Sequence, residues 1–300
     1  MGVLVIGSLA FDDIETDCGS LQDSPGGSAL YFAAAASLFA PVSLIGVVGD
    51  DFPRAELDFL RRRGVNIDHL DIVPGGKTFR WGCRYETDMN KRSTTNLEIN
   101  VFEHFKPVLC PELAASEYVF LGNIDPALQL SLLDQLTGPK FIGADTIECY
   151  IREKPALMKE MLKRVDFILI NDEEARLLTG EQNLVSACRA LLAFGPRYAV
   201  VKKGEHGSIL ASAEGLFVVP AYPIHTVIDP TGAGDSFAGA AFGYIAGAGD
   251  LSSATVRKAM VYGGVTASFT VEDFGLQRLK AISDADIEER LEQFRSITLF

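Results

Sequence analysis

The stretch Phe167-Ile168-Leu169-Ile170-Asn171-Asp172-Glu173-Glu174-Ala175-Arg176-Leu177-Leu178 predicts a strand that runs directly into a helix. Its first four residues form a short, continuous apolar run, which is typical of a strand buried on both faces. Asn171 is a favoured residue at a helix N-cap, and acidic residues are favoured in the first helical turn. The stretch therefore predicts one strand–helix unit of a layered α/β protein.

Similar apolar runs recur along the 300 residues of the chain. They occupy residues 3–6, 42–48, 118–121, 141–144 and 199–201. The last three of these runs are each followed by a helical pattern, and residues 29–39 and 52–63 predict further helices. Strands that alternate with helices form parallel sheets with right-handed crossovers. We therefore expect one α/β domain over residues 1–300, with a doubly wound, mostly parallel sheet flanked by helices.

The pattern changes between residues 77 and 102. Phe79, Trp81, Cys83 and Tyr85 are spaced two residues apart, which is the period of a strand with one exposed face. The polar stretch 94–101 is suited to pair with this strand. The segment therefore predicts a small β-sheet set apart from the main core.

Composition and charge exclude several classes of protein. A formal net charge of −13 repels nucleic-acid phosphates, so we expect no nucleic-acid partner. The five cysteines are scattered, and the chain begins without a secretory leader pattern, which together favour a cytoplasmic protein with reduced thiols. The most apolar long stretch, residues 237–248, is interrupted by glycines and is too short to span a bilayer, so we expect no membrane association.

The stretch Ile228-Asp229-Pro230-Thr231-Gly232-Ala233-Gly234-Asp235-Ser236-Phe237 carries the predicted chemistry. Gly232-Ala233-Gly234 has little side chain and precedes a helical pattern, so its N–H groups and the helix dipole are suited to bind a phosphoryl group in transit. Asp235, beside this anion hole, is placed to accept the proton of an attacking hydroxyl group. The alternative is an ordinary turn, because glycine-rich turns often precede helices and Asp is common in first turns.

The same stretch resembles the Asp-Thr-x-Gly-Ala-Gly-Asp motif of the PfkB/ribokinase family of carbohydrate kinases, with Pro230 in the second place. The resemblance extends over residues 7–275 and is closest in character to bacterial nucleoside kinases of that family. It implies a ribokinase-like fold and ATP-dependent transfer of a phosphoryl group to an alcohol. It also implies that Asp235 is the catalytic base and that Gly232-Ala233-Gly234 is the anion hole.

The N-terminal part of the chain resembles the family as well. Gly26 and Gly27 match a Gly-Gly pair that the family follows with an Asn that holds substrate hydroxyls, and Tyr31 stands in place of that Asn. Asp12 matches an Asp that binds a diol of the substrate, although a turn residue is the alternative. Asn123 follows a predicted strand, at the edge where parallel sheets bind ligands, and is a further candidate for the substrate.

The resemblance also implies a nucleotide site. Asn171 and Glu174 match an Asn-x-x-Glu element that orders Mg²⁺ through water, although Asn171 is equally suited to cap the helix. Gly204 and Gly207 match a Gly-x-x-Gly turn near the nucleotide. Lys202, just before this turn, is expected either near the phosphates or on the exposed surface.

Two further parts of the site are implied by the resemblance. Tyr262 and Val265 lie in the segment that flanks adenine in the family. Many members bind a monovalent cation beside the anion hole, and here K⁺ is expected near Asp229 and Thr231, with residues 267–275 completing its shell.

The small sheet resembles the family's lid, formed here by about residues 12–24 and 77–103, which closes over the substrate and excludes water. Trp81 in the lid, together with Tyr31, favours a substrate with a flat apolar group. We therefore expect a nucleoside that is phosphorylated on its ribose 5′-hydroxyl. The aromatic face of the lid is also suited to join two copies into a homodimer.

Other functions stay open at this point. One is a sugar kinase of the same family. Another is a sugar-phosphate kinase whose second anion is bound by Arg80, Arg84, Lys91 and Arg92. The third is a non-catalytic sensor of a nucleotide or metabolite, which the presence of both a base and an anion hole disfavours.

Overall fold

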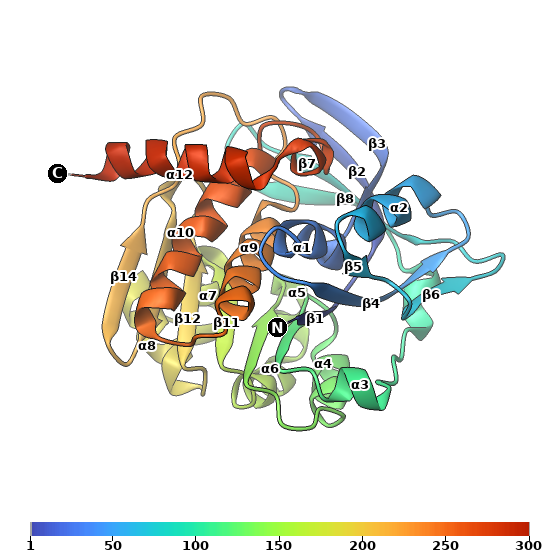
Figure 1. Cartoon of the computed structure of the whole chain (residues 1–300), viewed down its shortest axis with the longest axis horizontal. Coiled ribbons are helices and arrows are strands. Elements are labelled where there is room, and N and C mark those ends of the chain that lie inside the picture. Colours follow the sequence, from blue (N-terminus) through green and yellow to red (C-terminus); the bar gives the residue numbers. More distant parts are fainter. Residues whose placement is uncertain (1, 300) are drawn as a thin grey trace.

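The computed structural model of the chain describes residues 2–299. A central sheet forms the middle of the molecule (Figure 1). Its strands follow the order β14-β13-β12-β11-β10-β9-β1-β4-β5, and β6 pairs with β4. The parallel strands are β1 (Val3–Ile6), β4 (Val42–Gly49), β5 (Val65–Asn66), β6 (Leu70–Val73), β9 (Tyr118–Leu121), β10 (Phe141–Asp145), β11 (Phe167–Asn171) and β12 (Tyr198–Lys202). The predicted strands and their mostly parallel pairing are therefore confirmed.

The prediction of a helix after β12 was wrong. An antiparallel hairpin follows instead, made of β13 (Ser208–Ser212) and β14 (Gly215–Val219), with the short 3₁₀ turn η2 (Gly204–His206) before it. Gly204 and Gly207 adopt φ angles of +52° and +80°, which turn the chain back at once. A side chain at position 207 would overlap the carbonyl of Val219, so the hairpin packs too closely there for any residue but glycine.

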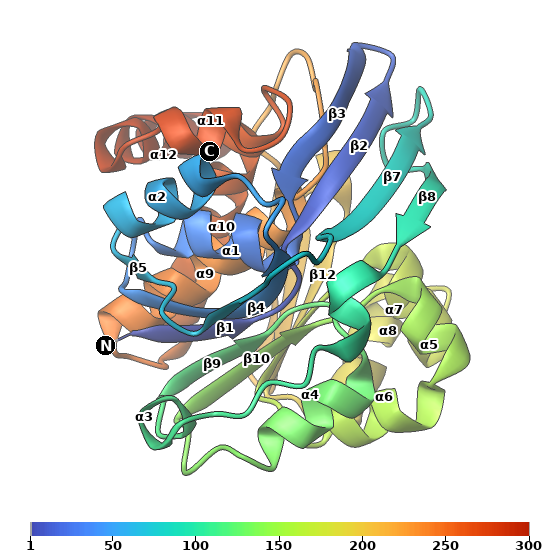
Figure 2. The ribbon, with the colours of Figure 1, turned by 90° about the vertical axis from the view of Figure 1, so that its right-hand side faces the viewer.

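Helices cover both faces of the sheet (Figure 2). One layer holds α1 (Ser28–Ala36), α2 (Arg54–Arg62), α9 (Ala233–Ala248), α10 (Ser253–Thr270), α11 (Gln277–Ala281) and α12 (Asp284–Thr298). The other layer holds η1 (Asn100–His104), α3 (Pro111–Ala114), α4 (Pro126–Leu133), α5 (Glu148–Glu153), α6 (Pro155–Leu162), α7 (Asp172–Thr179) and α8 (Leu184–Ala193). Within residues 2–299, no helix combines the length and the apolar character that a membrane span requires.

Helix α9 packs unusually close to α1. Side chains at Gly239, Gly243 and Gly247, which recur every four residues on one face of α9, would press against main-chain carbonyls at Phe32, Ala36 and Phe39. Glycines on α9 and alanines on α1 therefore let the two backbones meet. This contact fixes the N-terminus of α9, which carries the predicted chemistry, against the sheet.

A second sheet of four strands stands apart from the main sheet (Figure 2). Its order is β3-β2-β7-β8, with β2 (Ala10–Thr16), β3 (Gly19–Gly26), β7 (Phe79–Tyr85) and β8 (Arg92–Glu98). Strands β2 and β7 run parallel, and the other two pairs are antiparallel. One face buries Ile14, Cys83 and Tyr85, whereas every residue of β8 is exposed. The predicted small sheet is therefore present, with one covered face and one edge in solvent.

Candidate active site

The predicted anion hole lies at the N-terminus of α9. Gly232 is the N-cap of this helix and has a φ of +73°, a left-handed conformation that favours glycine. A side chain at position 232 would also overlap the ring of Tyr31. The N–H of Ala233 donates to the carbonyl of Pro230 at 3.2 Å, and no comparable partner is present for the N–H groups of Gly232 and Gly234 among the described residues. Those two groups are thus free to bind an anion.

Asp235 occupies the first turn of α9, beside this hole. Burial, reinforced by the negative charge of Asp145, raises the pKa of Asp235 to about 7, although Lys202 and Arg92 oppose the rise. A carboxyl group with this pKa is well matched to accept a proton near neutral pH.

Lys202, at the end of β12, points to the anion hole. Its Nζ atom would lie 3.0 Å from a Cβ built on Gly234, and it forms an ion pair with Asp145 Oδ2 at 3.2 Å. The side chain is 18% exposed, so the alternative of an exposed surface lysine does not hold. Burial opposes the charge of Lys202, yet the neighbouring Asp145, Glu174 and Asp235 raise its pKa. Lys202 is therefore a fixed cation beside the hole.

Asp12 lies within β2 and faces the same site. Its Oδ2 accepts a hydrogen bond from the N–H of Gly27 at 3.3 Å. Burial, with help from the negative charges of Asp229 and Asp235, raises the pKa of Asp12 to about 8. A side chain at Gly26 would overlap the Asp12 carboxyl group, which explains why glycine is required there. Asp12 is buried in a strand, so the alternative of a turn residue is wrong.

Tyr31 lies in the protein interior, whereas its sequence position predicted a residue that contacts the substrate. The residue is 1% exposed, and its ring packs against Gly232. A ring buried in this way cannot stack on a substrate base, so that interpretation of Tyr31 was wrong. Its hydroxyl group is buried without a hydrogen-bond partner among residues 2–299, and the charges of Asp12 and Asp229 act on it. The Tyr31 hydroxyl group is therefore a buried polar group near the acidic side chains of the site, without a partner among the described residues.

The inner face of the small sheet covers the site. Tyr85 Oη lies 3.1 Å from Thr231 Oγ1, one residue before the anion hole. Trp81 is partly buried on the same face, and its Nε1 donates to Thr94 Oγ1 at 3.3 Å. Part of this aromatic face thus packs against the chain itself, and the homodimer through the small sheet stays a prediction.

The segment after β11 forms a complete capping box. Asn171 Oδ1 accepts from the N–H of Glu174 at 2.8 Å, and Glu174 Oε2 accepts from the N–H of Asn171 at 3.0 Å. The predicted N-cap is therefore present. Burial, together with the charge of Asp145, raises the pKa of Glu174 to about 7, and its Oε1 atom remains uncommitted.

The loop after β12 meets the small sheet. A side chain at Gly204 would overlap the amide of Asn90, which lies in the turn between β7 and β8. The predicted nucleotide loop and the tip of the small sheet are thus in contact. Sequence reasoning missed this contact, because no local pattern links residues 90 and 204.

Two predicted nucleotide residues lie apart from the rest. Tyr262 stacks on Tyr244, with 4.4 Å between the ring centroids, and donates a hydrogen bond to Glu288. Val265 is buried in the helical layer around α10. The structure does not bring these two residues to the anion hole. Asn123 is half-buried just after β9 and has no side-chain hydrogen bond among the described residues.

Asp229 ties two distant segments together. Its Oδ1 accepts from the N–H of Thr231 at 2.8 Å, and its Oδ2 accepts from the N–H of Gly275 at 3.0 Å. The N–H of Ile228 also donates to the carbonyl of Val271 at 2.8 Å. Burial raises the pKa of Asp229. Because both carboxylate oxygens accept N–H groups, main-chain carbonyls remain the better candidates to bind a cation here.

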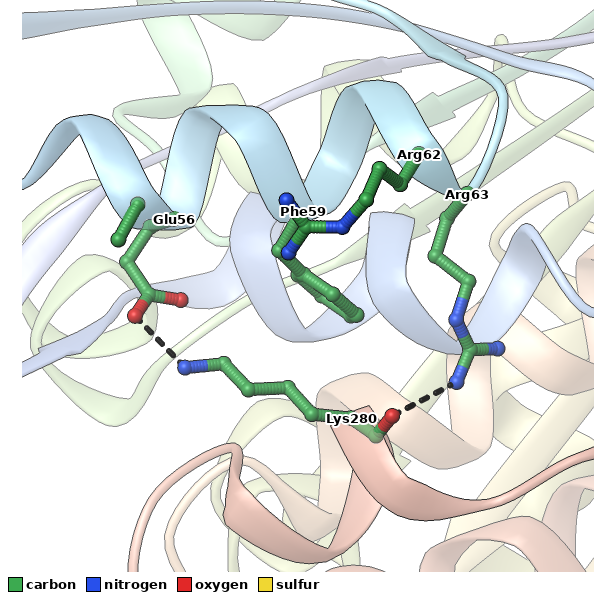
Figure 3. Close-up of a pocket in the computed structure, with 6 residues that line it drawn as sticks. Glu56, Phe59, Arg62, Arg63 and Lys280 are labelled. Carbon is green, nitrogen blue, oxygen red and sulfur yellow. Dashed lines mark hydrogen bonds and ion pairs between the residues drawn. The ribbon is translucent and has the colours of Figure 1, made fainter.

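A hollow of about 390 Å³ between α2 and α11 lies outside this site (Figure 3). Glu56 and Lys280 form an ion pair at 2.6 Å across it, and Arg63 donates to the carbonyls of Leu279 and Ile282. These contacts hold α2 against α11. The hollow therefore belongs to the scaffold, and among residues 2–299 no cluster of three His, Cys, Asp or Glu side chains is arranged to hold a metal ion.

The chain is similar in sequence to several known proteins. The model of the pfkB family carbohydrate kinases matches residues 3–282. The chain is 32% identical over 255 residues to a cytidine kinase from Thermococcus kodakarensis, covering 82% of this chain and 88% of that protein. It is 27% identical over 286 residues to a nucleoside kinase from Methanocaldococcus jannaschii, covering 90% of this chain and 88% of that protein.

Solved structures share the fold. A nucleoside kinase from Methanocaldococcus jannaschii superposes with a TM-score of 0.76 at 21% identity, covering 97% of this chain and 98% of that chain. A nucleoside kinase from Burkholderia thailandensis, solved with inosine, also gives a TM-score of 0.76, at 20% identity over 97% of this chain and 96% of that chain.

Proposed function

This chain belongs to the pfkB family of carbohydrate kinases, and from that premise we propose that it transfers the γ-phosphoryl group of ATP to the ribose 5′-hydroxyl of a nucleoside. As a member of the family, it is a phosphotransferase that acts on a hydroxyl group, and the family implies ATP and a divalent cation. The observation that carries the proposal is Asp235, which lies half-buried in the first turn of α9 beside the free N–H groups of Gly232 and Gly234. The relatives named as cytidine and nucleoside kinases support the acceptor.

The chain's own residues divide the reaction into three tasks. Asp12 holds a ribose hydroxyl with the carboxylate oxygen that Gly27 leaves free. Asp235 takes the proton of the 5′-hydroxyl as its oxygen bonds to the γ-phosphorus and the bond to the bridging oxygen of ADP breaks. The N–H groups of Gly232 and Gly234, with Lys202, bind the negative charge of the phosphoryl group in transit.

Glu174 suits an indirect role in metal binding. Its Oε1 atom is uncommitted, and the residue is buried near Asp145. Mg²⁺ keeps several waters when it binds to proteins. The free Oε1 atom of Glu174 is therefore suited to accept a hydrogen bond from one of those waters. When bound, Mg²⁺ neutralises charge on the donor's phosphates.

K⁺ is the proposed monovalent cation. The hydrogen bonds of Asp229 to Thr231 and Gly275 bring the two segments of its shell together beside the anion hole. Replacement of potassium by tetramethylammonium in the assay is expected to lower turnover. Unchanged turnover would remove K⁺ from the proposal.

A neutral acceptor is favoured over a sugar phosphate by the charges on the small sheet. Arg80 pairs with Asp23, and Arg84 pairs with Glu15 at 2.8 Å. Lys91 lies 3.5 Å from Asp88. Three of the four cations that a second anion site requires are therefore already paired with carboxylates of the chain.

Three properties stay predictions. A cytoplasmic location is supported by the five cysteines, which are all free. The absence of a nucleic-acid partner rests on the net charge of −13. Self-association is tested by sedimentation of the full chain with and without ATP.

The proposed function is tested by measuring ATP consumption with Mg²⁺ and K⁺ against nucleosides, free sugars and sugar phosphates. We expect one nucleoside to be turned over far faster than every sugar. Turnover of a sugar alone would keep Asp235 as the base and reject the nucleoside. If no compound of the panel stimulates ATP consumption while the protein still binds ATP, a non-catalytic sensor would be favoured.

A further inference from the structure

The active site gathers five acidic side chains of the chain. The carboxyl groups of Asp12, Asp145, Glu174, Asp229 and Asp235 converge on it. Lys202 is the cation closest to the anion hole, and it is already paired with Asp145. A phosphoryl donor adds more negative charge, which must be balanced in a site from which water is excluded. Mg²⁺ and K⁺, as proposed above, supply part of this balance, and a second cation of the chain beside Lys202 would add to it.

Arg92, the first residue of β8, differs from its basic neighbours on the small sheet. Arg80, Arg84 and Lys91 each pair with a carboxylate, whereas Arg92 has no ion pair or hydrogen bond to its side chain among residues 2–299. Arg92 is exposed, and its guanidinium group lies 5.7 Å from the centre of the ring of the partly buried Trp81. Arginine binds phosphate with two parallel hydrogen bonds, which an unpaired guanidinium group is free to make.

Two contacts fix where Arg92 lies. In the β7–β8 ladder it is directly opposite Tyr85, so the two side chains share one face of the sheet. Tyr85 contacts Thr231, next to the anion hole. Two residues before Arg92, Asn90 contacts Gly204 in the predicted nucleotide loop. Arg92 therefore begins β8 between two neighbours, of which one contacts the anion-hole loop and the other the nucleotide loop.

The electrostatics of the site agree with this position. The positive charge of Arg92 lowers the pKa of both Asp235 and Glu174, which lie on different elements of the site. Both carboxyl groups also act on Lys202, so Arg92 and Lys202 influence the same two acids.

We infer that Arg92 is a further catalytic residue, whose guanidinium group reaches from the small sheet to bind the γ-phosphoryl group of the donor. This inference rests on the proposed function for the identity of the donor, but not for the identity of the acceptor. By this inference the small sheet has a second function besides the exclusion of water, because it carries the positive charge of Arg92.

The test compares Arg92→Gln, Arg92→Lys and the matched control Arg84→Gln, which removes a guanidinium group from the outer face of the same sheet. Affinity for ADP and for a non-hydrolysable ATP analogue is measured by calorimetry with Mg²⁺. For Arg92→Gln we expect the analogue to bind about ten-fold more weakly and ADP to bind within about two-fold of the original affinity. Arg92→Lys should retain part of the analogue affinity, and Arg84→Gln should change neither.

Turnover gives a second readout. With the best acceptor of the panel, kcat of Arg92→Gln should fall about 100-fold, as expected for the loss of a group that stabilises the charge of a transition state. Equal weakening of ADP and the analogue, unchanged binding of both, or an equal loss in Arg84→Gln would each overturn the inference. Because the binding experiment needs no acceptor, failure of the nucleoside assignment is seen separately in the acceptor panel.

Discussion

The hydroxyl group of Tyr85 lies 3.1 Å from Thr231 Oγ1 and joins the small sheet to the loop that carries the anion hole. The two residues are 146 positions apart in the sequence, and both are buried. Thr231 in turn donates its N–H to Asp229, which also accepts from Gly275. One chain of hydrogen bonds thus runs from the small sheet to the segment predicted to hold a monovalent cation.

The first prediction concerns this contact. Tyr85→Phe removes the hydroxyl group and keeps the ring, so the docked position of the small sheet loses one hydrogen bond, worth about 1 kcal/mol. We expect the KM for the acceptor to rise about five-fold, while the KM for ATP changes less than about two-fold. Steady-state kinetics measures both constants. Tyr150→Phe, on α5 away from the site, is the control, and an equal rise of both KM values in Tyr85→Phe would contradict the prediction.

The second prediction separates backbone strain from close packing at Gly232. Gly232 and Gly138 have nearly the same φ, +73° and +71°, but a side chain at 232 would overlap Tyr31, whereas the space around 138 is open. Gly138→Ala therefore adds only left-handed strain, about 1 kcal/mol. Gly232→Ala adds overlap as well, and we expect a loss of about 3 kcal/mol in the free energy of unfolding, with kcat lowered at least about ten-fold.

Denaturant unfolding and turnover of the two variants test this prediction. The difference between them isolates the contact with Tyr31, because the backbone term is common to both. Equal losses in the free energy of unfolding for Gly232→Ala and Gly138→Ala would mean that the overlap with Tyr31 does not destabilise the folded state.

Much of the fold could be predicted from local patterns. Apolar runs such as Tyr118–Leu121 coincide with observed strands, because a strand covered on both faces must be apolar throughout. The helix cap formed by Asn171 and Glu174 could also be predicted, because its hydrogen bonds join residues only three positions apart in the sequence. The hairpin after β12 was missed, because two glycines with positive φ outweigh the helical pattern that follows them.

The remaining errors concern contacts between distant segments. The spacing of Trp81 and Tyr85 correctly placed both on one face of a strand, but it does not say which residues cover that face. Tyr31 fills space beside Gly232, a contact between α1 and the start of α9 that no periodicity reports. The position of Arg92 likewise depends on the pairing of β7 with β8 and on the docking of their turn at Gly204.

The third prediction concerns stability and pH. Burial raises the pKa of Asp12 from 3.8 to about 8, so the folded state holds this proton more tightly than the unfolded state. The contribution of Asp12 to stability is therefore fully present below about pH 4 and is lost as the pH rises to about 8, by an amount on the order of a few kcal/mol. Asp12→Asn keeps the group neutral, so its stability relative to the original protein should increase between about pH 5 and about pH 8.

Unfolding by denaturant at several pH values, without ligands, measures this difference. Asp68→Asn, at an exposed residue of the loop before β6, is the control for the removal of a surface carboxyl group. A constant difference between Asp12→Asn and the original protein over this range would mean that Asp12 ionises normally in the folded state.

The fourth prediction is the pH profile of turnover. Asp235 has a pKa raised to about 7 and must be unprotonated to accept the hydroxyl proton, so kcat at saturating acceptor should fall about ten-fold per pH unit below 7 and level off above it. The charged groups that act on Asp235 are Asp12, Asp145, Lys202 and Arg92. Asp235→Asn should lower kcat about 1,000-fold, lose this acid limb and keep ADP affinity, because only the base is removed. A profile that is flat from about pH 5.5 to about pH 8 would show that a different group accepts the proton.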